Sequence, residues 1–340
     1  MTTPATTPRK APAPMAEIWR GPMAESVHLG HAVICGQGGE VIEAWGDADV
    51  QVYPRSSCKM IQGLPLVESG AADAAGLGPE QLALACASHN GAAIHTQRVK
   101  KWVTGLGLVE GDFRCGSHMP DDKEAAHALI RAHQEPGQLH NNCSGKHAGF
   151  LTLNRHLGGA ADYIEIAHPV QRACLSAFEE VTGEASPGYG IDGCSAPNFL
   201  TSLSGMGRAM AFFAGAREGS DARQSAAARL RDAMIAHPDL VAGEGRACTM
   251  LMRACNEPVA LKTGAEAFFV AILPQRGIGV ALKVTDGGTR GAECAIASLL
   301  VRLGALDADH PSARMFMNKT MTNWRGFETG AIRPAPGLLA

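Results

Sequence analysis

Two segments typical of β-hairpins lie near opposite ends of this chain, and their separation constrains the fold more than any other feature. Apolar and polar residues roughly alternate over 26–34, glycines follow at 36–39, and residues 40–45 run back. Near the other end, residues 267–284 form two apolar stretches joined by Pro274-Gln-Arg-Gly277. No Gly-Lys-Ser/Thr follows the glycines at 36–39, so we interpret them as a turn and not as a phosphate-binding loop.

The residues between the hairpins have mostly helical periodicity, from about 56 to 240. The clearest helix spans 220–236, with Ser220 as its N-cap and a stop before His237-Pro238. A further helix is expected over about 289–304. Because hairpins distant in the sequence flank one helical block, we expect an α+β fold, in which an antiparallel β-sheet has flanking helices and an inserted helical lobe.

Composition suggests where the folded part begins. Residues 1–15 are rich in Pro, Thr and Ala, which predicts a disordered tail. Residues 16–340 are then expected to form a single domain, with the helical lobe over about 56–250 and a cleft beside it. Hydrophobic residues make up 46% of the chain and charged residues 19%, which is enough apolar material for a sizeable core.

Charge and hydropathy argue against two classes of protein. Thirty basic and 33 acidic residues leave a net charge of −3, which does not suit a nucleic-acid binder. No window of 18 uncharged apolar residues exists, so no membrane span is expected. The N-terminus has no apolar signal-peptide region, and the chain is too long for a disulfide-stapled mini-domain. We therefore expect a reduced, cytoplasmic protein whose ten cysteines are mostly core residues.

Ser56-Ser-Cys-Lys59 is the first candidate for catalysis. If a helix begins there, the Ser56 hydroxyl and the Lys59 amine share one face, because positions three apart are neighbours on a helix. A serine nucleophile needs a base, and a lysine can act as one if burial and a second cation lower its pKa toward about 7–8. Taken alone, the motif more often means an exposed helical lysine.

Two further motifs follow in a meaningful order. Cys86-Ala-Ser88-His-Asn90 supplies Ser-x-Asn, and Lys262-Thr-Gly264 lies directly before the strand expected from 267. Ser-x-x-Lys, Ser-x-Asn and Lys-Thr-Gly occur in this order in serine acyl-transfer enzymes of the penicillin-recognising type. In this chain a helical block is inserted between two groups of strands, an arrangement that would bring the three motifs together. We therefore expect a fold like that of β-lactamases and penicillin-binding proteins.

Two Gly-rich polar loops, residues 141–149 and 190–197, each contain a cysteine. The thiolates of Cys143 and Cys194 would favour a soft metal such as Zn²⁺. However, Cys-x-x-Lys is unusual, because Lys146 must lose its proton before it can coordinate. Spacing alone therefore favours two unlinked loop cysteines.

Taken together, these motifs resemble the asparaginase II family, the zinc-binding class of L-asparaginases with a β-lactamase-like fold. The resemblance covers about residues 17–335. The segments that carry it are Arg55-Ser56-Ser-Cys-Lys59, Cys86-Ala-Ser88-His-Asn90, Cys115-Gly-Ser-His118-Met-Pro120, Asn142-Cys143-Ser-Gly-Lys146-His147, Gly190-Ile-Asp192-Gly-Cys194, Lys262-Thr-Gly-Ala-Glu266, Lys283-Val-Thr-Asp286-Gly-Gly-Thr-Arg290 and Asn323-Trp-Arg-Gly-Phe-Glu-Thr-Gly330.

The resemblance implies a single catalytic domain that hydrolyses L-asparagine to L-aspartate and ammonia, with little activity on glutamine. It implies two catalytic Ser-Lys pairs, Ser56 with Lys59 and Ser88 with Lys262. It also implies a zinc site at Cys143, Lys146 and Cys194, and a homodimer.

The expected mechanism starts with attack by Ser56 on the side-chain amide while Lys59 accepts its proton. Ser88 and Lys262 relay a proton or position the substrate, and zinc positions the substrate. Substrate-binding candidates are Arg55 for the α-carboxylate, Asp192 for the α-ammonium, Asn90, and more weakly Arg290.

Two alternatives remain open at this point. One is a β-lactamase-like serine hydrolase acting on another amide, which a fluorescent penicillin would label. The other is a non-catalytic protein that binds a metal or an amino acid, which its ligand would stabilise without release of ammonia. Ser57 adds a second hydroxyl that complicates the choice of nucleophile.

Overall fold

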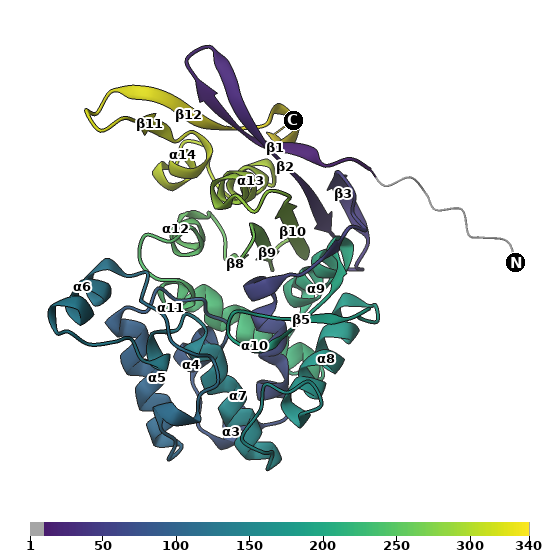
Figure 1. Cartoon of the computed structure of the whole chain (residues 1–340). Helices are drawn as coiled ribbons and strands as arrows, with labels where there is room; N and C mark the ends of the chain where they lie inside the picture. The colour runs from purple at the N-terminus through teal and green to yellow at the C-terminus, as the bar shows by residue number, and fades with distance from the viewer. Residues whose placement is uncertain (1–9, 340) are drawn as a thin grey trace, which may run out of the picture.

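The structure, a computed structural model, describes residues 10–339, and its centre is an eight-stranded antiparallel sheet (Figure 1). The strands follow the order β11-β12-β1-β2-β10-β9-β8, and β3 pairs with β2 off this path. Their bounds are Ala13–Arg20 (β1), Met23–Cys35 (β2), Val41–Trp45 (β3), Ala260–Gly264 (β8), Phe268–Leu273 (β9), Ile278–Val284 (β10), Thr320–Thr322 (β11) and Glu328–Pro334 (β12).

Both expected hairpins are confirmed and lie side by side in this sheet. In the first, Ile34 pairs with Glu43. The turn between them contains Gly39, whose φ of 83° is a conformation that glycine adopts freely. In the second, Val280 pairs with Ala271. The two hairpins join where β2 pairs with β10, so segments from opposite ends of the chain form one surface.

Helices cover both faces of the sheet. All six residues of β9 are buried, which requires cover on each face of the sheet. Helices α9 (Leu203–Gly215) and α13 (Thr289–Arg302) supply it, because each packs against β9 and β10. The remaining C-terminal helices are α14 (Pro311–Met317) and α15 (Pro336–Leu339).

The inserted helical lobe lies between β3 and β8 in the chain and gathers on one side of the sheet, opposite α13 and α14 (Figure 1). A 3₁₀ turn, Arg55–Cys58, leads into it. Its helices are Lys59–Gln62 (α1), Leu64–Glu68 (α2), Ala71–Ala74 (α3), Pro79–Ala85 (α4), Ala93–Gly105 (α5), Lys123–Arg131 (α6), Ser144–Leu157 (α7), Pro169–Thr182 (α8), Ala222–Ala236 (α10), Pro238–Val241 (α11) and Ala247–Ala254 (α12). Short strands pair within it, Gln51–Val52 (β4) with Thr201–Ser202 (β7), and Tyr189–Ile191 (β5) with Pro197–Phe199 (β6).

The expected α+β class, with an antiparallel sheet, flanking helices and an inserted helical lobe, is confirmed. Two local predictions differ from the structure. The N-cap of α10 is Asp221 and not Ser220, because the Asp221 carboxylate accepts the Gln224 N–H at 2.7 Å. Strand β1 begins at Ala13, since its pairing with β2 orders residues that we expected in the tail. Residues 1–9 of that expected tail lie outside the described residues.

None of the helices within residues 10–339 combines the length and the apolar character that crossing a membrane requires.

Candidate active site

The hydroxyl of Ser88 lies between two buried lysine amines. Lys59 is the first residue of α1, Ser88 follows α4, and Lys262 lies in the edge strand β8. Lys59 Nζ lies 2.9 Å from Ser88 Oγ, and Lys262 Nζ lies 2.8 Å from the same atom. Both lysine side chains are about as buried as core residues, each with 1% of its surface exposed. The three motifs expected to meet therefore do meet.

Backbone pairing holds Ser88 in this place. After α4 ends, the Ser88 N–H donates to the Val241 carbonyl at 2.9 Å, and the Asn90 N–H donates to the Ala242 carbonyl at 3.0 Å. On the other side, the Lys262 amine also donates to the Thr263 carbonyl at 2.7 Å. The loop and the strand thus orient the hydroxyl and the amine toward each other.

Burial changes the acid–base chemistry of the Lys262 amine. Burial first, and the nearby Lys59 cation second, lower the pKa of Lys262 from 10.5 to about 7. A lysine with this pKa holds a neutral amine in a large fraction of molecules near neutral pH. The cluster therefore contains a base that can accept a proton from a serine.

Ser56 and Ser57 differ in what their hydroxyls contact. Ser57 is fully buried, and its hydroxyl donates to the Pro54 carbonyl at 2.5 Å. Ser56 is half-buried, and in the described part of the chain no hydrogen bond engages its hydroxyl. The Lys59 amine is bonded to Ser88, and also to the Ala87 carbonyl, and not to Ser56 as the spacing predicted. Of the two hydroxyls, Ser56 is the one free to reach a substrate.

Arg55 holds an unusual backbone conformation beside the candidate nucleophile. Its φ is 52°, in the left-handed region that residues other than glycine rarely adopt. Its guanidinium donates twice to one carboxylate oxygen of Asp192, from Nε at 2.9 Å and from Nη2 at 2.7 Å. Two of the four residues predicted to bind substrate are therefore paired with each other.

Cys143, Lys146 and Cys194 converge from two elements. Cys143 precedes α7 and Lys146 lies in its first turn, while Cys194 lies in the turn between β5 and β6. Lys146 Nζ lies 3.0 Å from Cys194 Sγ, and the Cys143 thiol donates to the side-chain oxygen of Asn142 at 2.9 Å. Lys59 Nζ lies 3.2 Å from Cys143 Sγ, so this cluster adjoins the Ser88 cluster.

The donor set of this cluster fits a soft metal ion. The neighbouring Cys143 side chain and the Lys146 charge hold the pKa of Cys194 well below the usual range, against the opposing effect of burial, which favours a thiolate. Burial alone would lower the pKa of Lys146, but the two sulfurs raise it, so metal binding would have to displace a proton. Nε2 of His147 is buried without a hydrogen-bond partner among residues 10–339.

A metal at this cluster would need the lysine as its third donor. Within the described range, no group of three or more His, Cys, Asp or Glu side chains gathers in a way that could hold a metal ion. The two sulfurs with the Lys146 amine are the set that remains.

The side chains of Asn90 and Arg290 both have hydrogen-bond partners within the protein. The Asn90 side-chain oxygen accepts the Ala92 N–H at 3.3 Å, and its amide packs so closely on Gly243 that a Cβ there would lie 2.5 Å away. Arg290 lies in α13, where its Nε donates to His28 at 2.9 Å, and His28 in turn bonds Asp286 at 2.7 Å. The structure does not bring Arg290 into the Ser88 cluster.

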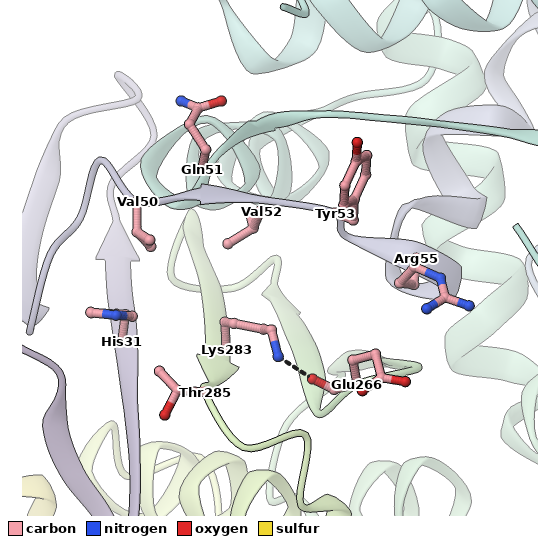
Figure 2. Close-up of a pocket in the computed structure, with 9 residues that line it drawn as sticks. All are labelled: His31, Val50, Gln51, Val52, Tyr53, Arg55, Glu266, Lys283 and Thr285. Carbon is pink, nitrogen blue, oxygen red and sulfur yellow. Dashed lines mark hydrogen bonds between the residues drawn. The ribbon is translucent and has the colours of Figure 1, made fainter. Parts of the chain in front are cut away.

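A pocket of about 410 Å³ has Arg55 in its lining (Figure 2). Figure 2 shows Arg55 at one end and His31 at the other, with Lys283 between them. Asp47 donates its N–H to Nδ1 of His31 at 2.8 Å, which makes Nε2 of this histidine a donor. The Lys283 amine donates to the backbone carbonyls of Glu266 and Val284.

Sequence reasoning missed Asn198 and the role of Gly264. The Asn198 amide contacts both backbone polar groups of Arg55. A polar residue within the apolar segment 197–200 was the available signal. At Gly264, a Cβ would lie 2.6 Å from the Pro54 carbonyl oxygen, so only glycine allows β8 to approach this turn.

Comparisons with known proteins give the following likenesses. A comparison with curated protein sequences returned no match. Among solved structures, a putative β-lactamase from Bacteroides dorei DSM 17855 is 13% identical, with 75% of this chain and 84% of that chain covered and a TM-score of 0.38. A β-lactamase from Mycobacterium bovis is 12% identical, with 82% and 95% covered and a TM-score of 0.38. Mglu in its native form is 15% identical, with 90% and 71% covered and a TM-score of 0.38.

The family comparison extends over nearly the whole chain. The model of the L-asparaginase II family matches residues 16–334. This range contains every motif on which the sequence resemblance rested, and it agrees with the expected extent of about 17–335. The chain therefore belongs to the L-asparaginase II family.

Proposed function

We propose that this protein hydrolyses the side-chain amide of L-asparagine to L-aspartate and ammonia, with Ser56 as the nucleophile. Family membership indicates an asparaginase-type amidohydrolase that acts on a small-molecule substrate. The observation that carries the proposal is the Ser88 hydroxyl held between the amines of Lys59 and Lys262, with Lys59 three residues after Ser56 in the chain.

Ser56 Oγ attacks the amide carbon, and its proton passes to the lysine cluster. When the tetrahedral intermediate collapses, the C–N bond breaks and the cluster returns the proton to the leaving nitrogen, so ammonia departs. Water then adds to the acyl-serine ester and gives its proton to the same cluster. The ester C–O bond breaks, the cluster returns the proton to the Ser56 oxygen, and aspartate is released.

Ser88 connects the two amines in this scheme. Because the pKa of Lys262 is about 7, the pair holds one neutral amine above that pH. The Ser88 hydroxyl touches both amines and can accept a proton from one while it donates its own to the other. A proton taken up near Ser56 can therefore reach Lys262, which is fully buried.

Arg55 and Asp192 are the groups that we propose for the α-carboxylate and the α-ammonium of asparagine. They already form an ion pair with side-chain exposures of 28% and 12%. The partly exposed guanidinium can accept a carboxylate, while the carboxylate oxygens of Asp192 suit an ammonium. The substrate would thus bind against a preformed ion pair, with its carboxylate on the guanidinium and its ammonium on the carboxylate.

Cys143, Lys146 and Cys194 would hold a zinc ion. Zinc bound there would supply a Lewis acid beside the substrate. The chain's own contribution is to gather the three donors and to bury them, with Cys194 favoured as thiolate by its neighbours. The homodimer and the preference for asparagine over glutamine stay predictions.

Ammonia release from L-asparagine tests the proposal, with Ser57→Ala as a matched control for Ser56→Ala. Ser56→Ala should abolish turnover, whereas Ser57→Ala should keep most of it, because the Ser57 hydroxyl contacts only the Pro54 carbonyl. Zinc content should be measured on each sample. Folded, zinc-loaded wild-type protein that releases no ammonia would overturn the asparaginase proposal, and an active Ser56→Ala variant would overturn the choice of nucleophile.

A further inference from the structure

The residue before the proposed nucleophile is held in a conformation that its own side chain disfavours. Arg55 has a φ of 52°, and a Cβ makes this region unfavourable for residues other than glycine. Such a conformation persists only when the surroundings hold it in place. Since Ser56 follows directly, any relaxation of Arg55 would redirect the Ser56 side chain.

The carboxamide of Asn198 contacts both backbone polar groups of Arg55. Its oxygen accepts the Arg55 N–H at 3.2 Å, and its nitrogen donates to the Arg55 carbonyl at 3.3 Å. Asn198 is 2% exposed, so water does not readily replace these bonds. We propose that Asn198 is a positioning residue that holds Arg55 in its left-handed conformation and thereby orients the Ser56 hydroxyl.

The hairpin that carries Asn198 makes it suited to this role. Asn198 lies in β6, the hairpin formed with β5 also carries Asp192 and Cys194, and Asp192 binds the Arg55 side chain. One hairpin therefore holds Arg55 by its backbone and by its guanidinium. Phe199, the next residue, packs on Phe178 of α8 with ring centroids 5.7 Å apart, which fixes the hairpin to the helical lobe.

The same turn is confined from the opposite side. Gly264 of β8 approaches so closely that an added Cβ would lie 2.6 Å from the Pro54 carbonyl oxygen and 3.1 Å from the Ser57 nitrogen. The segment 54–57 is thus held between β6 and β8. Loss of the Asn198 contacts would remove the restraint on one side of this segment, while the contact with β8 on the other side remains.

The inference rests on the proposed role of Ser56, and kinetics with Asn198→Leu test it. Leucine has the same number and branching of side-chain heavy atoms as asparagine but is larger and apolar, so this variant loses both hydrogen bonds to Arg55 and the longer contact with Cys58. We expect kcat to fall about tenfold to a hundredfold, as for a misplaced reacting group, and KM to rise as well, because Arg55 is also the group proposed for the α-carboxylate. Asn198→Asp, which keeps an acceptor for the Arg55 N–H, should give an intermediate kcat and serves if the leucine variant does not fold. Thr182→Val, which removes a buried hydrogen bond in α8, should leave kcat unchanged.

A rescue experiment separates positioning from general destabilisation. Glycine adopts a positive φ without strain. In an Arg55→Gly background, the orientation of Ser56 should therefore depend less on the two hydrogen bonds from Asn198. There, Asn198→Leu should lower the remaining kcat by no more than about threefold. An equal loss of kcat in both backgrounds, or a normal kcat in Asn198→Leu, would overturn the inference.

The unfolding equilibrium tests whether Asn198 holds the Arg55 backbone, even if the proposed function fails. Asn198→Leu should lower the denaturation midpoint more in the Arg55 chain than in the Arg55→Gly chain, because only Arg55 needs to be held. If the variants show this difference but the wild-type protein releases no ammonia, the proposed function is contradicted, while the role of Asn198 in holding Arg55 is supported. Equal shifts of the midpoint in both chains would show that Asn198 does not hold Arg55.

Discussion

The amine of Lys262 donates to the hydroxyl of Ser88 at 2.8 Å, across 174 positions of sequence. A strand at the edge of the sheet and a loop of the helical lobe supply one residue each. Lys59 approaches the same hydroxyl from α1, so its charge acts on Lys262 in addition to burial. The lowered pKa of Lys262 therefore results from the meeting of the two parts of the fold.

Activity should depend on the protonation of Lys262. Its pKa of about 7 means that the neutral amine is lost as the pH falls below 7, so kcat/KM should fall in that direction. Lys262→Met, which keeps the length and loses the amine, should lower kcat by about 10²- to 10⁴-fold. Lys262→Arg, always protonated, should not restore it. A wild-type pH profile that stays flat from 5 to 9 would contradict this role.

Stability should also follow the titration of Lys262. Lysine has a pKa of about 10.4 in the unfolded chain and a lowered one here, so between about pH 7 and 10.4 the unfolded state binds more protons. The free energy of unfolding should therefore rise with pH in this window, by up to about 1.4 kcal/mol per pH unit, and this gain is lost again as the pH falls from about 10.4 to 7.

Urea denaturation at several pH values measures this effect, with Lys262→Met as the reference. The groups that act on Lys262 through their charge, namely Lys59, Cys248, Arg246 and Cys143, remain in the variant. The difference in slope between wild type and variant thus isolates Lys262. Identical slopes in the two proteins would show that the amine titrates alike in folded and unfolded chains.

Gly264→Ala should impair catalysis through the backbone of the nucleophile turn. Its new Cβ would meet the Pro54 carbonyl oxygen at 2.6 Å, and backbone atoms cannot move aside cheaply. We expect a loss of stability of about 1–3 kcal/mol and a lower kcat. Gly105→Ala, at the end of α5 with no atom within 4 Å of its new Cβ, is the matched control and should lose neither. Wild-type kcat in Gly264→Ala would show that the turn tolerates the displacement.

Zinc binding should depend on residues from both loops. Purified protein analysed by elemental mass spectrometry should contain zinc, and Cys194→Ala or Lys146→Ala should lose most of it, because removing one of three donors leaves an incomplete site. Cys294→Ala, a buried cysteine in α13, is the control and should keep its zinc. Zinc retained in Cys194→Ala, or absent from wild type purified with added zinc, would remove the metal from the proposed site.

Much of the fold could be predicted because its signals are local. Alternation of apolar residues indicated both hairpins, and helical periodicity indicated α10 and α13. The strands β1, β11 and β12 were missed. Few of their residues are fully buried, which leaves a weak pattern in the sequence, and it is pairing with distant strands that orders them.

The sequence by itself determined which chemical groups are available: the order of the three motifs, the serines, the lysines and the two loop cysteines. Only the tertiary structure decided how they are used. In the folded protein the Lys59 amine donates to Ser88 and not to Ser56, and the Ser57 hydroxyl donates to the Pro54 carbonyl. The physical reason is that hydrogen-bond partners and the pKa of a buried amine depend on which atoms surround it. Those atoms come from strands and loops that the chain brings together only on folding.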